Sequence, residues 1–170
     1  MPDPVFFYGP RNTWGEFSNF YPCQFVLDEQ VWVTSEHYYM GQKTTDLTER
    51  ERIRKASSAR EAKAMGRKVR LRAGWDGMKF SIMEKAAYAK FDQNTPLREV
   101  LFDTGDRPIH ENCRDPWWGG GPNFPNGRDW LGKVLLRVRE RLAERYRSEF
   151  EAAQQGQKWE AEWVTKVLTD

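Results

Sequence analysis

The sequence predicts a mostly helical protein of the α+β class, with a small antiparallel β element near the N-terminus. After residue 34, hydrophobic residues recur every three or four positions in most segments, which is the period of amphipathic helices. Short aromatic and β-branched runs separated by turn residues precede that point and are typical of strands. A length of 170 residues corresponds to one domain. We therefore expect a single compact domain over residues 1–148 and a helical extension over residues 149–170.

The β element is predicted from short runs that end at turn signals. Residues 6–8 form an aromatic run that stops at a Gly-Pro pair. Residues 25–27 and 31–33 flank a polar turn at residues 28–30, which predicts a hairpin. Residues 15–20 are small and polar, so we expect a loop between these segments.

Capping residues mark the starts of the predicted helices. The helices are expected from Thr34 or Ser35 to about Lys43, from Asp46 to about Ala56, from Ser58 with Glu61 as a capping box to Gly66, from residue 77 to 92, from a Thr95-Pro96 cap to Phe102, and from Leu131 to Tyr146. Residues 103–129 are rich in Gly and Pro and predict a long ordered loop, a kind of segment that is often functional. After an expected break at residues 154–157, Trp159, Trp163 and Val167 predict a final short helix that docks on the domain or meets another subunit.

Composition excludes several classes of protein. The 27 Lys and Arg residues against 25 Asp and Glu leave a net charge of +2, which gives no strong signal for a dedicated duplex DNA binder. No apolar run approaches the roughly 18 residues of a membrane span, and residues 1–10 lack the features of a signal peptide. We therefore expect a cytoplasmic protein with no membrane partner. The combination of 14% aromatic residues with a mean hydropathy of −0.84 is compatible with an aromatic-lined ligand site.

The first candidate constellation is the segment Thr34-Ser-Glu-His-Tyr-Tyr-Met-Gly-Gln-Lys43. On a helix, Glu36, Met40 and Lys43 share one stripe, so an acid and an amine could face the same site. The alternative is that Glu36 and Lys43 only complement the two ends of the helix dipole. The residues alone leave both interpretations open.

Two Gly-containing segments are further candidates. Asp115-Pro-Trp-Trp118-Gly119-Gly-Gly combines an acid and paired aromatic rings with a backbone that a ligand can approach closely, although a tight turn anchored by a buried Trp explains it equally well. Gly15-Glu-Phe-Ser18-Asn19 offers hydroxyl and amide groups that could hold a sugar or a phosphate.

Metal, cofactor and nucleophile-elbow chemistry is not supported by any motif. His37, His110, Cys23 and Cys113 are not spaced as zinc ligands, and two cysteines are too few for a disulfide framework. The sequence contains no nucleophile elbow, P-loop or dinucleotide fingerprint. We therefore expect neither a metal nor a cofactor.

Five motifs in order resemble the NADAR, or YbiA-like, family. They are Gly15-Glu-Phe-Ser-Asn-Phe, Thr34-Ser-Glu-His-Tyr-Tyr-Met-Gly-Gln-Lys, Ala86-Ala-Tyr-Ala-Lys-Phe, Asp115-Pro-Trp-Trp-Gly-Gly-Gly and Leu131-Gly-Lys-Val-Leu-Leu-Arg-Val-Arg. The resemblance runs from about residue 6 to residue 145. It implies a mostly helical fold, no metal, and an N-glycosidase that cleaves a base or amine from ribose. Members act on phosphorylated intermediates of riboflavin synthesis or remove ADP-ribose from guanine.

The resemblance also implies roles for individual residues. Glu36, Lys43 and Asp115 fall on the catalytic positions of the family motifs. In one route the Lys43 amine attacks the ribose C1′ and forms a Schiff base, while a carboxyl group protonates the leaving nitrogen. In the other route the carboxylates act alone and Lys43 binds phosphate.

Substrate binding is expected to involve a further set of residues. They are Arg11, Gly15, Ser18, Asn19, Trp75, Trp118 and Gly119. Trp118, with Trp75, would stack on the base or ribose, and the others would hold hydroxyl or phosphate groups. Two departures from the family pattern, Asp129 where Asn is common and Glu111 at an altered spacing, bear on substrate choice.

Several functions remain open from the sequence. The leading hypothesis is an N-glycosidase for a small phosphorylated ribosyl substrate such as a riboflavin-synthesis intermediate. A second substrate class is ADP-ribosylated guanine in nucleic acid or a nucleotide, which the near-neutral charge favours less. A third hypothesis is a non-catalytic module that binds ADP-ribose or a related nucleotide.

Overall fold

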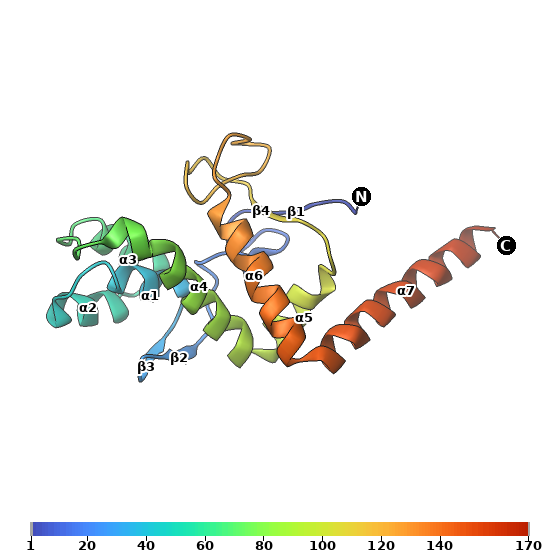
Figure 1. The fold of residues 1–170 in the computed structure, drawn as a ribbon, viewed down its shortest axis with the longest axis horizontal. Helices are drawn as coiled ribbons and strands as arrows, with labels where there is room; N and C mark the ends of the chain where they lie inside the picture. Colours follow the sequence, from blue (N-terminus) through green and yellow to red (C-terminus); the bar gives the residue numbers. More distant parts are fainter. Residues whose placement is uncertain (1, 170) are drawn as a thin grey trace.

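The protein forms two small sheets surrounded by helices (Figure 1). A computed structural model describes residues 2–169, with the side chains of residues 2–157 and of residue 166. The elements are β1 (Val5–Phe7), the 3₁₀ helix η1 (Gly15–Phe17), β2 (Phe25–Leu27), β3 (Gln30–Trp32), α1 (Ser35–Gly41), α2 (Leu47–Arg54), α3 (Ala59–Gly66), α4 (Trp75–Gln93), α5 (Thr95–Asp103), β4 (Ile109–Glu111), α6 (Trp130–Arg145) and α7 (Arg147–Thr169). This architecture confirms the predicted fold class.

The predicted hairpin is present as β2 and β3. The two strands are antiparallel, and Phe25 pairs with Trp32 while Leu27 pairs with Gln30. Phe25 and Trp32 bury their rings on the same face, which fixes the register. Asp28 has a positive φ of 50° and forms the turn, as is usual for tight hairpin connections.

A second sheet pairs β1 with β4, and this corrects the prediction of an uninterrupted loop over residues 103–129. The strands are parallel, with Val5 opposite Ile109 and Phe7 opposite Glu111. Val5 and Ile109 are buried, so the pairing closes over apolar side chains. Strand β4 has only three residues, and two of them are polar. It is therefore too short to show the alternation of apolar and polar residues by which a strand is recognised in a sequence.

The side-chain caps of three predicted helices are confirmed. The side chain of Thr34 accepts a hydrogen bond from the backbone N–H of His37, and Asp46 accepts from the N–H groups of Thr48 and Glu49. Ser58 caps α3 in the same way.

Several helix boundaries differ from the prediction by one or two residues, among them those of α1, α4 and α5. α1 ends at Gly41 rather than at Lys43, and α4 begins at Trp75. The residue that precedes α5 is Asn94 rather than Thr95, so Thr95 and Pro96 both lie inside the first turn.

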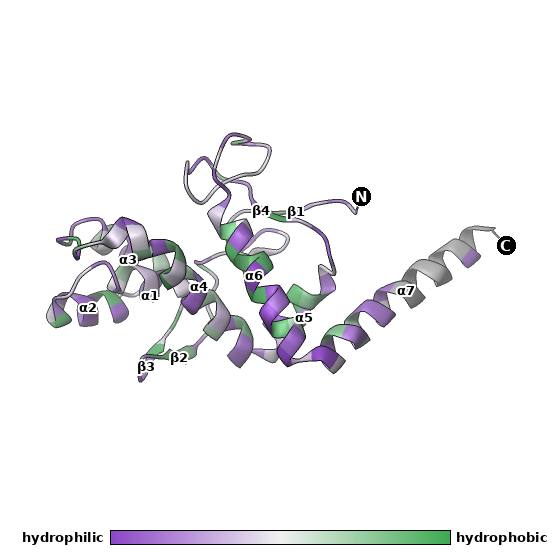
Figure 2. Ribbon diagram, viewed as in Figure 1, coloured by the Kyte–Doolittle hydropathy of each residue, from purple (hydrophilic) through white to green (hydrophobic). Residues whose placement is uncertain are grey.

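The main core lies where α4, α6 and the β1–β4 sheet meet. The sequence predicts a stripe of Leu131, Leu135, Val138, Leu142 and Tyr146 on α6; the first four are buried, and Tyr146, which follows the helix, is half-buried. Figure 2 shows apolar and polar residues alternating along this helix.

On α4 the sequence predicts a stripe of Met78, Ile82, Ala86 and Ala89. Ala86 and Ala89 are buried, whereas Met78 and Ile82 are half-buried. The buried face of α4 also includes Trp75, Met83 and Ala87.

Helix α7 is continuous from Arg147 to Thr169, so the predicted break at residues 154–157 is wrong. One glycine in a helix costs only about 1 kcal/mol relative to alanine. The glutamines beside Gly156 have a high helix propensity, so the helix continues through it. Near its start α7 is anchored to α5, because Glu149 pairs with Arg98 at 2.9 Å and Phe150 packs against Phe102. Further along α7, Gln154 and Gln157 donate hydrogen bonds to the carbonyls of Phe102 and Asp103 at the end of α5. The C-terminal part of the helix then projects from the body (Figure 1). The predicted roles of the side chains Trp159, Trp163 and Val167 lie outside the described residues.

Within residues 2–169, no helix combines the length and the apolar character that crossing a bilayer requires.

Candidate functional site

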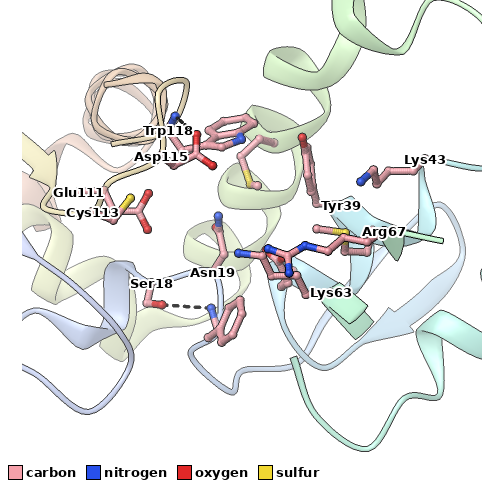
Figure 3. A pocket seen from close by; sticks show the side chains of 14 residues that line it. Ser18, Asn19, Tyr39, Lys43, Lys63, Arg67, Glu111, Cys113, Asp115 and Trp118 are labelled. Atoms are coloured by element: carbon pink, nitrogen blue, oxygen red, sulfur yellow. Dashed lines mark hydrogen bonds between the residues drawn. The ribbon is translucent and has the colours of Figure 1, made fainter. Parts of the chain in front are cut away.

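A cavity of about 250 Å³ opens between α1, α3, α4, the segment that follows η1, and the end of β4 with the segment after it. Polar and charged side chains from segments far apart in the sequence line it together with a few aromatic and sulfur-containing ones (Figure 3). The lining residues are Ser18, Asn19, Phe20, Glu36, Tyr39, Met40, Lys43, Lys63, Arg67, Met83, Glu111, Cys113, Asp115 and Trp118. The structure therefore brings together all three predicted catalytic residues.

Glu36 is held in the cavity by the N-terminus of α1. The backbone N–H of Glu36 donates to the Asn19 carbonyl at 3.1 Å, and the Ser35 hydroxyl donates to the Asn19 side-chain oxygen at 3.0 Å. Glu36 is only 5% exposed, and burial raises the pKa of its carboxyl to about 7. The Lys63 ammonium opposes this rise and the Glu111 carboxylate adds to it. A carboxyl group with this pKa can exchange a proton near neutral pH.

Lys43 reaches the cavity from the turn that follows α1. Its N–H donates to the Met40 carbonyl at 3.2 Å, so the lysine lies just beyond the helix instead of on the predicted stripe. Lys43 is half-buried, and burial lowers the pKa of its ammonium group while the Glu36 carboxylate opposes that change. The pairing of an acid and an amine in one site is therefore achieved without a shared helical face.

Asp115 organises the turn that carries Trp118. One of its carboxylate oxygens, Oδ1, accepts hydrogen bonds from the N–H groups of Trp117 and Trp118 at 2.9 and 3.0 Å. A β-carbon on Gly119 would overlap the Cys113 carbonyl, which explains the glycine by packing of the turn. The tight-turn and ligand-site interpretations thus both apply, since Asp115 and Trp118 also line the cavity.

The aromatic side of the cavity is formed by Tyr39 and Trp118, whose rings meet edge to face with centroids 5.5 Å apart. Trp75 packs behind Tyr39 at 5.1 Å and is itself buried. It therefore supports this wall and lies outside the cavity lining.

The other predicted binding residues divide into two groups. Ser18 and Asn19 line the cavity, whereas Arg11, Gly15 and Gly119 are not among the lining residues. Arg11 is exposed, and a β-carbon on Gly15 would overlap the Pro10 carbonyl, so this glycine serves the local turn.

A basic wall on α3 has no counterpart among the residues predicted from the sequence. Lys63 and Arg67 are four residues apart, so they share one face of the helix end, and both line the cavity (Figure 3). Lys63 also lies 5.5 Å from the centroid of the Phe20 ring. In the sequence this pair is indistinguishable from the other basic residues of an exposed helix, and only the packing of α3 against α1 reveals it.

Glu111 is a second acid in the cavity, half-buried by its exposed surface, which the sequence marked only as a departure in spacing. It comes from the end of β4, and burial raises the pKa of its carboxyl to about 7. The neighbouring Cys113 thiol has its pKa raised to about 12 by burial and by the Glu111 carboxylate, so it stays protonated. The sequence could not place Glu111 in the site because strand β4, which carries this residue, was not predicted.

Asp129, the other departure, lies elsewhere. Its Oδ2 is 2.6 Å from Nδ1 of His110, and neither residue lines the cavity. Among the residues whose placement is described, no three His, Cys, Asp or Glu side chains form a group that could hold a metal ion.

Two small sheets with helices packed around a polar, aromatic-walled cavity define an α+β domain whose site has room for a small ligand. The chain belongs to the NADAR domain family, whose sequence model matches residues 6–143. This confirms the resemblance seen in the motifs.

Individual relatives agree with this membership. The N-glycosidase YbiA of Shigella boydii is 40% identical over 140 residues, which cover 81% of this chain and 87% of the relative. The riboflavin biosynthesis protein VVA0006 of Vibrio vulnificus is 37% identical over 147 residues, which cover 85% of this chain but only 40% of that protein. The NMR structure of the Escherichia coli protein YbiA superposes with a TM-score of 0.77 at 38% identity, covering 85% of this chain and 88% of that one.

Proposed function

We propose that this protein is an N-glycosidase that hydrolyses the bond between ribose C1′ and an amine or base nitrogen in a phosphorylated substrate. The names of the Shigella and Vibrio relatives support the activity and the area of metabolism. The observation that carries the proposal is the buried carboxyl of Glu36, whose pKa is raised to about 7 inside a cavity of ligand size.

The chemistry needs an acid at the leaving nitrogen and a nucleophile at C1′. A carboxyl with a pKa near 7 is half protonated at neutral pH, which suits it to donate a proton in the transition state and to recover it afterwards. A second carboxyl in the same cavity can accept the proton that the nucleophile loses. Such acid and base assistance typically contributes factors of roughly 10² to 10⁴ in rate.

The nucleophile is either water or the Lys43 amine. We favour Lys43, because burial lowers the pKa of its ammonium group and so increases the fraction of neutral amine that can attack C1′. The resulting Schiff base would be released by water. The carboxylates are required in both routes.

The substrate class follows from the opposing walls of the cavity. Lys63 and Arg67 offer two cations to a phosphate group, with Arg67 able to bind it in a bidentate manner. Tyr39 and Trp118 present aromatic surface to a planar base. A ribose 5′-phosphate that carries a pyrimidine amine, as in a riboflavin-synthesis intermediate, combines both requirements.

The test is release of free base from defined substrates. The protein is incubated with the phosphoribosylamino-pyrimidine intermediate and, separately, with DNA that carries ADP-ribosylated guanine. Wild-type protein is expected to release the amine from the pyrimidine substrate, and Glu36→Gln is expected to lower the rate at least 100-fold. Glu140→Gln, on the exposed side of α6, is the matched control with unchanged rate. Absence of base release by wild type on both substrates would exclude the N-glycosidase proposal, and equal release by wild type and Glu36→Gln would exclude the catalytic role of Glu36.

A further inference from the structure

We infer that Glu111 is a second catalytic residue, which works as an acid–base pair with Glu36, and that the role of Asp115 is to position the turn beside them. The inference rests on the proposed N-glycosidase function. It changes the assignment of the second carboxyl from Asp115, the residue expected from the family motif, to a residue at the end of β4.

The backbone of Glu111 is fixed more firmly than a loop residue would be. Residue 111 pairs with Phe7 in the parallel sheet, and its carbonyl oxygen accepts hydrogen bonds from the N–H groups of Cys113, Gly120 and Gly121 at 2.9, 3.0 and 3.3 Å. Its side chain is left to line the cavity, and in Figure 3 its carboxylate points toward Asn19. A catalytic group gains precision when it is carried by such a braced element.

Asp115 is committed to its own turn. Its Oδ1 accepts from two backbone N–H groups, and its carbonyl accepts from the N–H of Gly119 at 2.9 Å. Turning the side chain toward a substrate atom would break both Oδ1 bonds and release the turn that holds Trp118. The Asp115 carboxylate is therefore suited to fixing geometry.

The Glu111 carboxylate influences Glu36, and the Lys63 ammonium influences both carboxyls. Glu36 is influenced by Lys63, Glu111, Lys43 and Arg67, and Glu111 by Cys113, Asp115, Lys63 and Asp129. Burial is the main reason that the pKa of both carboxyls is about 7, and like charge adds to it for Glu36. Two such groups in one cavity titrate as a pair, which retains about one proton near neutral pH.

One proton on two carboxyls is what hydrolysis requires. The protonated carboxyl donates its proton to the glycosidic nitrogen as the C1′–N bond breaks and the bonding electrons move to nitrogen. The ionised carboxyl accepts a proton from the attacking water, whose oxygen forms the new bond to C1′. The free amine and the sugar leave, and the pair again holds one proton, now on the other carboxyl. Attack by the Lys43 amine uses the same two proton transfers to displace the leaving nitrogen. Protonation of the ring oxygen then breaks the C1′–O4′ bond and gives a protonated Schiff base, and water adds to C1′ and releases the Lys43 amine.

The kinetic test compares Glu111→Gln with Asp115→Asn. The Asn side chain keeps an oxygen that can accept the two N–H bonds, so Asp115→Asn removes charge while retaining the turn. With the phosphoribosylamino-pyrimidine substrate, we expect Glu111→Gln to lower kcat at least 100-fold with little change in KM, and to remove one limb of the pH profile of kcat. We expect the loss of kcat for Asp115→Asn to be at least tenfold smaller. A larger loss for Asp115→Asn than for Glu111→Gln would overturn the assignment.

A second measurement does not depend on turnover. The side-chain carboxyl carbons of ¹³C-labelled glutamate are titrated by NMR in wild type and in Glu111→Gln, with Glu140→Gln as the control. Removing the neighbouring carboxylate should lower the pKa of Glu36, and an unchanged Glu36 titration would show that the two groups are not a pair. Absence of base release by wild type would instead overturn the proposed function, whereas wild-type activity with unimpaired Glu111→Gln would overturn only the role of Glu111.

Discussion

The Nζ atom of Lys90 donates a hydrogen bond to the carbonyl oxygen of Ser18 at 2.9 Å, and the two residues are 72 positions apart in the chain. Lys90 is 1% exposed and lies between the rings of Tyr21 and Phe91. The bond ties the segment that presents Ser18 and Asn19 to the middle of the molecule. Because Lys90 is buried, its ammonium group has lost contact with water, and this burial lowers its pKa to about 8.

This lowered pKa predicts a specific dependence of stability on pH. In the unfolded chain Lys90 titrates near 10.5, so between pH 8 and 10.5 the unfolded state binds more protons and this group makes folding more favourable as pH rises. The free energy of unfolding of wild type minus that of Lys90→Met should therefore increase over this range, by up to about 3 kcal/mol. Urea titrations of both proteins at pH 7 and pH 10 measure it. A difference that stays constant with pH would contradict the burial of a charged Lys90.

Lys43 should be trapped by reduction during turnover. We expect borohydride, added with the phosphoribosylamino-pyrimidine substrate, to attach the sugar phosphate to Lys43, because the neutral amine forms a Schiff base in the favoured route. Mass spectrometry of peptides identifies the residue. Lys55, which is exposed on α2, should remain unmodified. Turnover with unmodified Lys43 would show that water attacks directly and that the carboxylates act without an amine.

The basic wall should govern recognition of phosphate. Lys63→Met and Arg67→Met should each lower kcat/KM for the phosphorylated substrate about 10- to 100-fold, since a hydrogen bond to a charged group contributes roughly 1.5–3 kcal/mol. The same substrate without its phosphate should be turned over equally by variants and wild type. Lys68→Met, one position beyond Arg67 and outside the cavity lining, is the control. Equal losses on both substrates would mean that these residues do not bind the phosphate.

Two glycines should respond in opposite ways to alanine. A β-carbon on Gly66 would overlap the sulfur of Met40, which lines the cavity, so Gly66→Ala should destabilise the protein by about 1–3 kcal/mol. Gly77 lies in α4, where a β-carbon would meet no atom within 4 Å, so Gly77→Ala should stabilise by about 0.5–1 kcal/mol. Thermal unfolding measures both. A stabilised Gly66→Ala variant would show that Met40 can yield its position freely.

The helices were largely predictable because their signals are local. Capping residues such as Thr34, Asp46 and Ser58 act within one turn, and the stripe on α6 is visible in its own sequence. The expected break near Gly156 was wrong because the weak preference of a single glycine is outweighed by the rest of the helix. Strand β4 was missed because its partner lies more than 100 positions away and sets its conformation.

The site was predictable only where a motif carried it. Glu36, Lys43, Asp115 and Trp118 came from the family resemblance and lie together in the cavity. Lys63, Arg67 and Glu111 could not be chosen, because a surface lysine and one that lines a cavity look alike until the helices are packed. Trp75 was expected to contact the ligand, but it packs behind Tyr39 and does not line the cavity. Which of these two rings faces the cavity depends on the orientation of Tyr39, which the sequence does not reveal.

The parallel pairing of β1 with β4 makes the cavity dependent on the order in which the chain is assembled. Glu111 is held by residues that are synthesised first, yet its own segment emerges only after the helices that form the other walls. Closing so long a segment is entropically costly, so a nascent chain that ends before residue 109 would contain Glu36 and Lys43 without the wall that β4 and the segment after it provide. Deletion of residues 1–8 from the complete chain would remove β1, the pairing partner of β4, and should leave the cavity open on the side of Glu111.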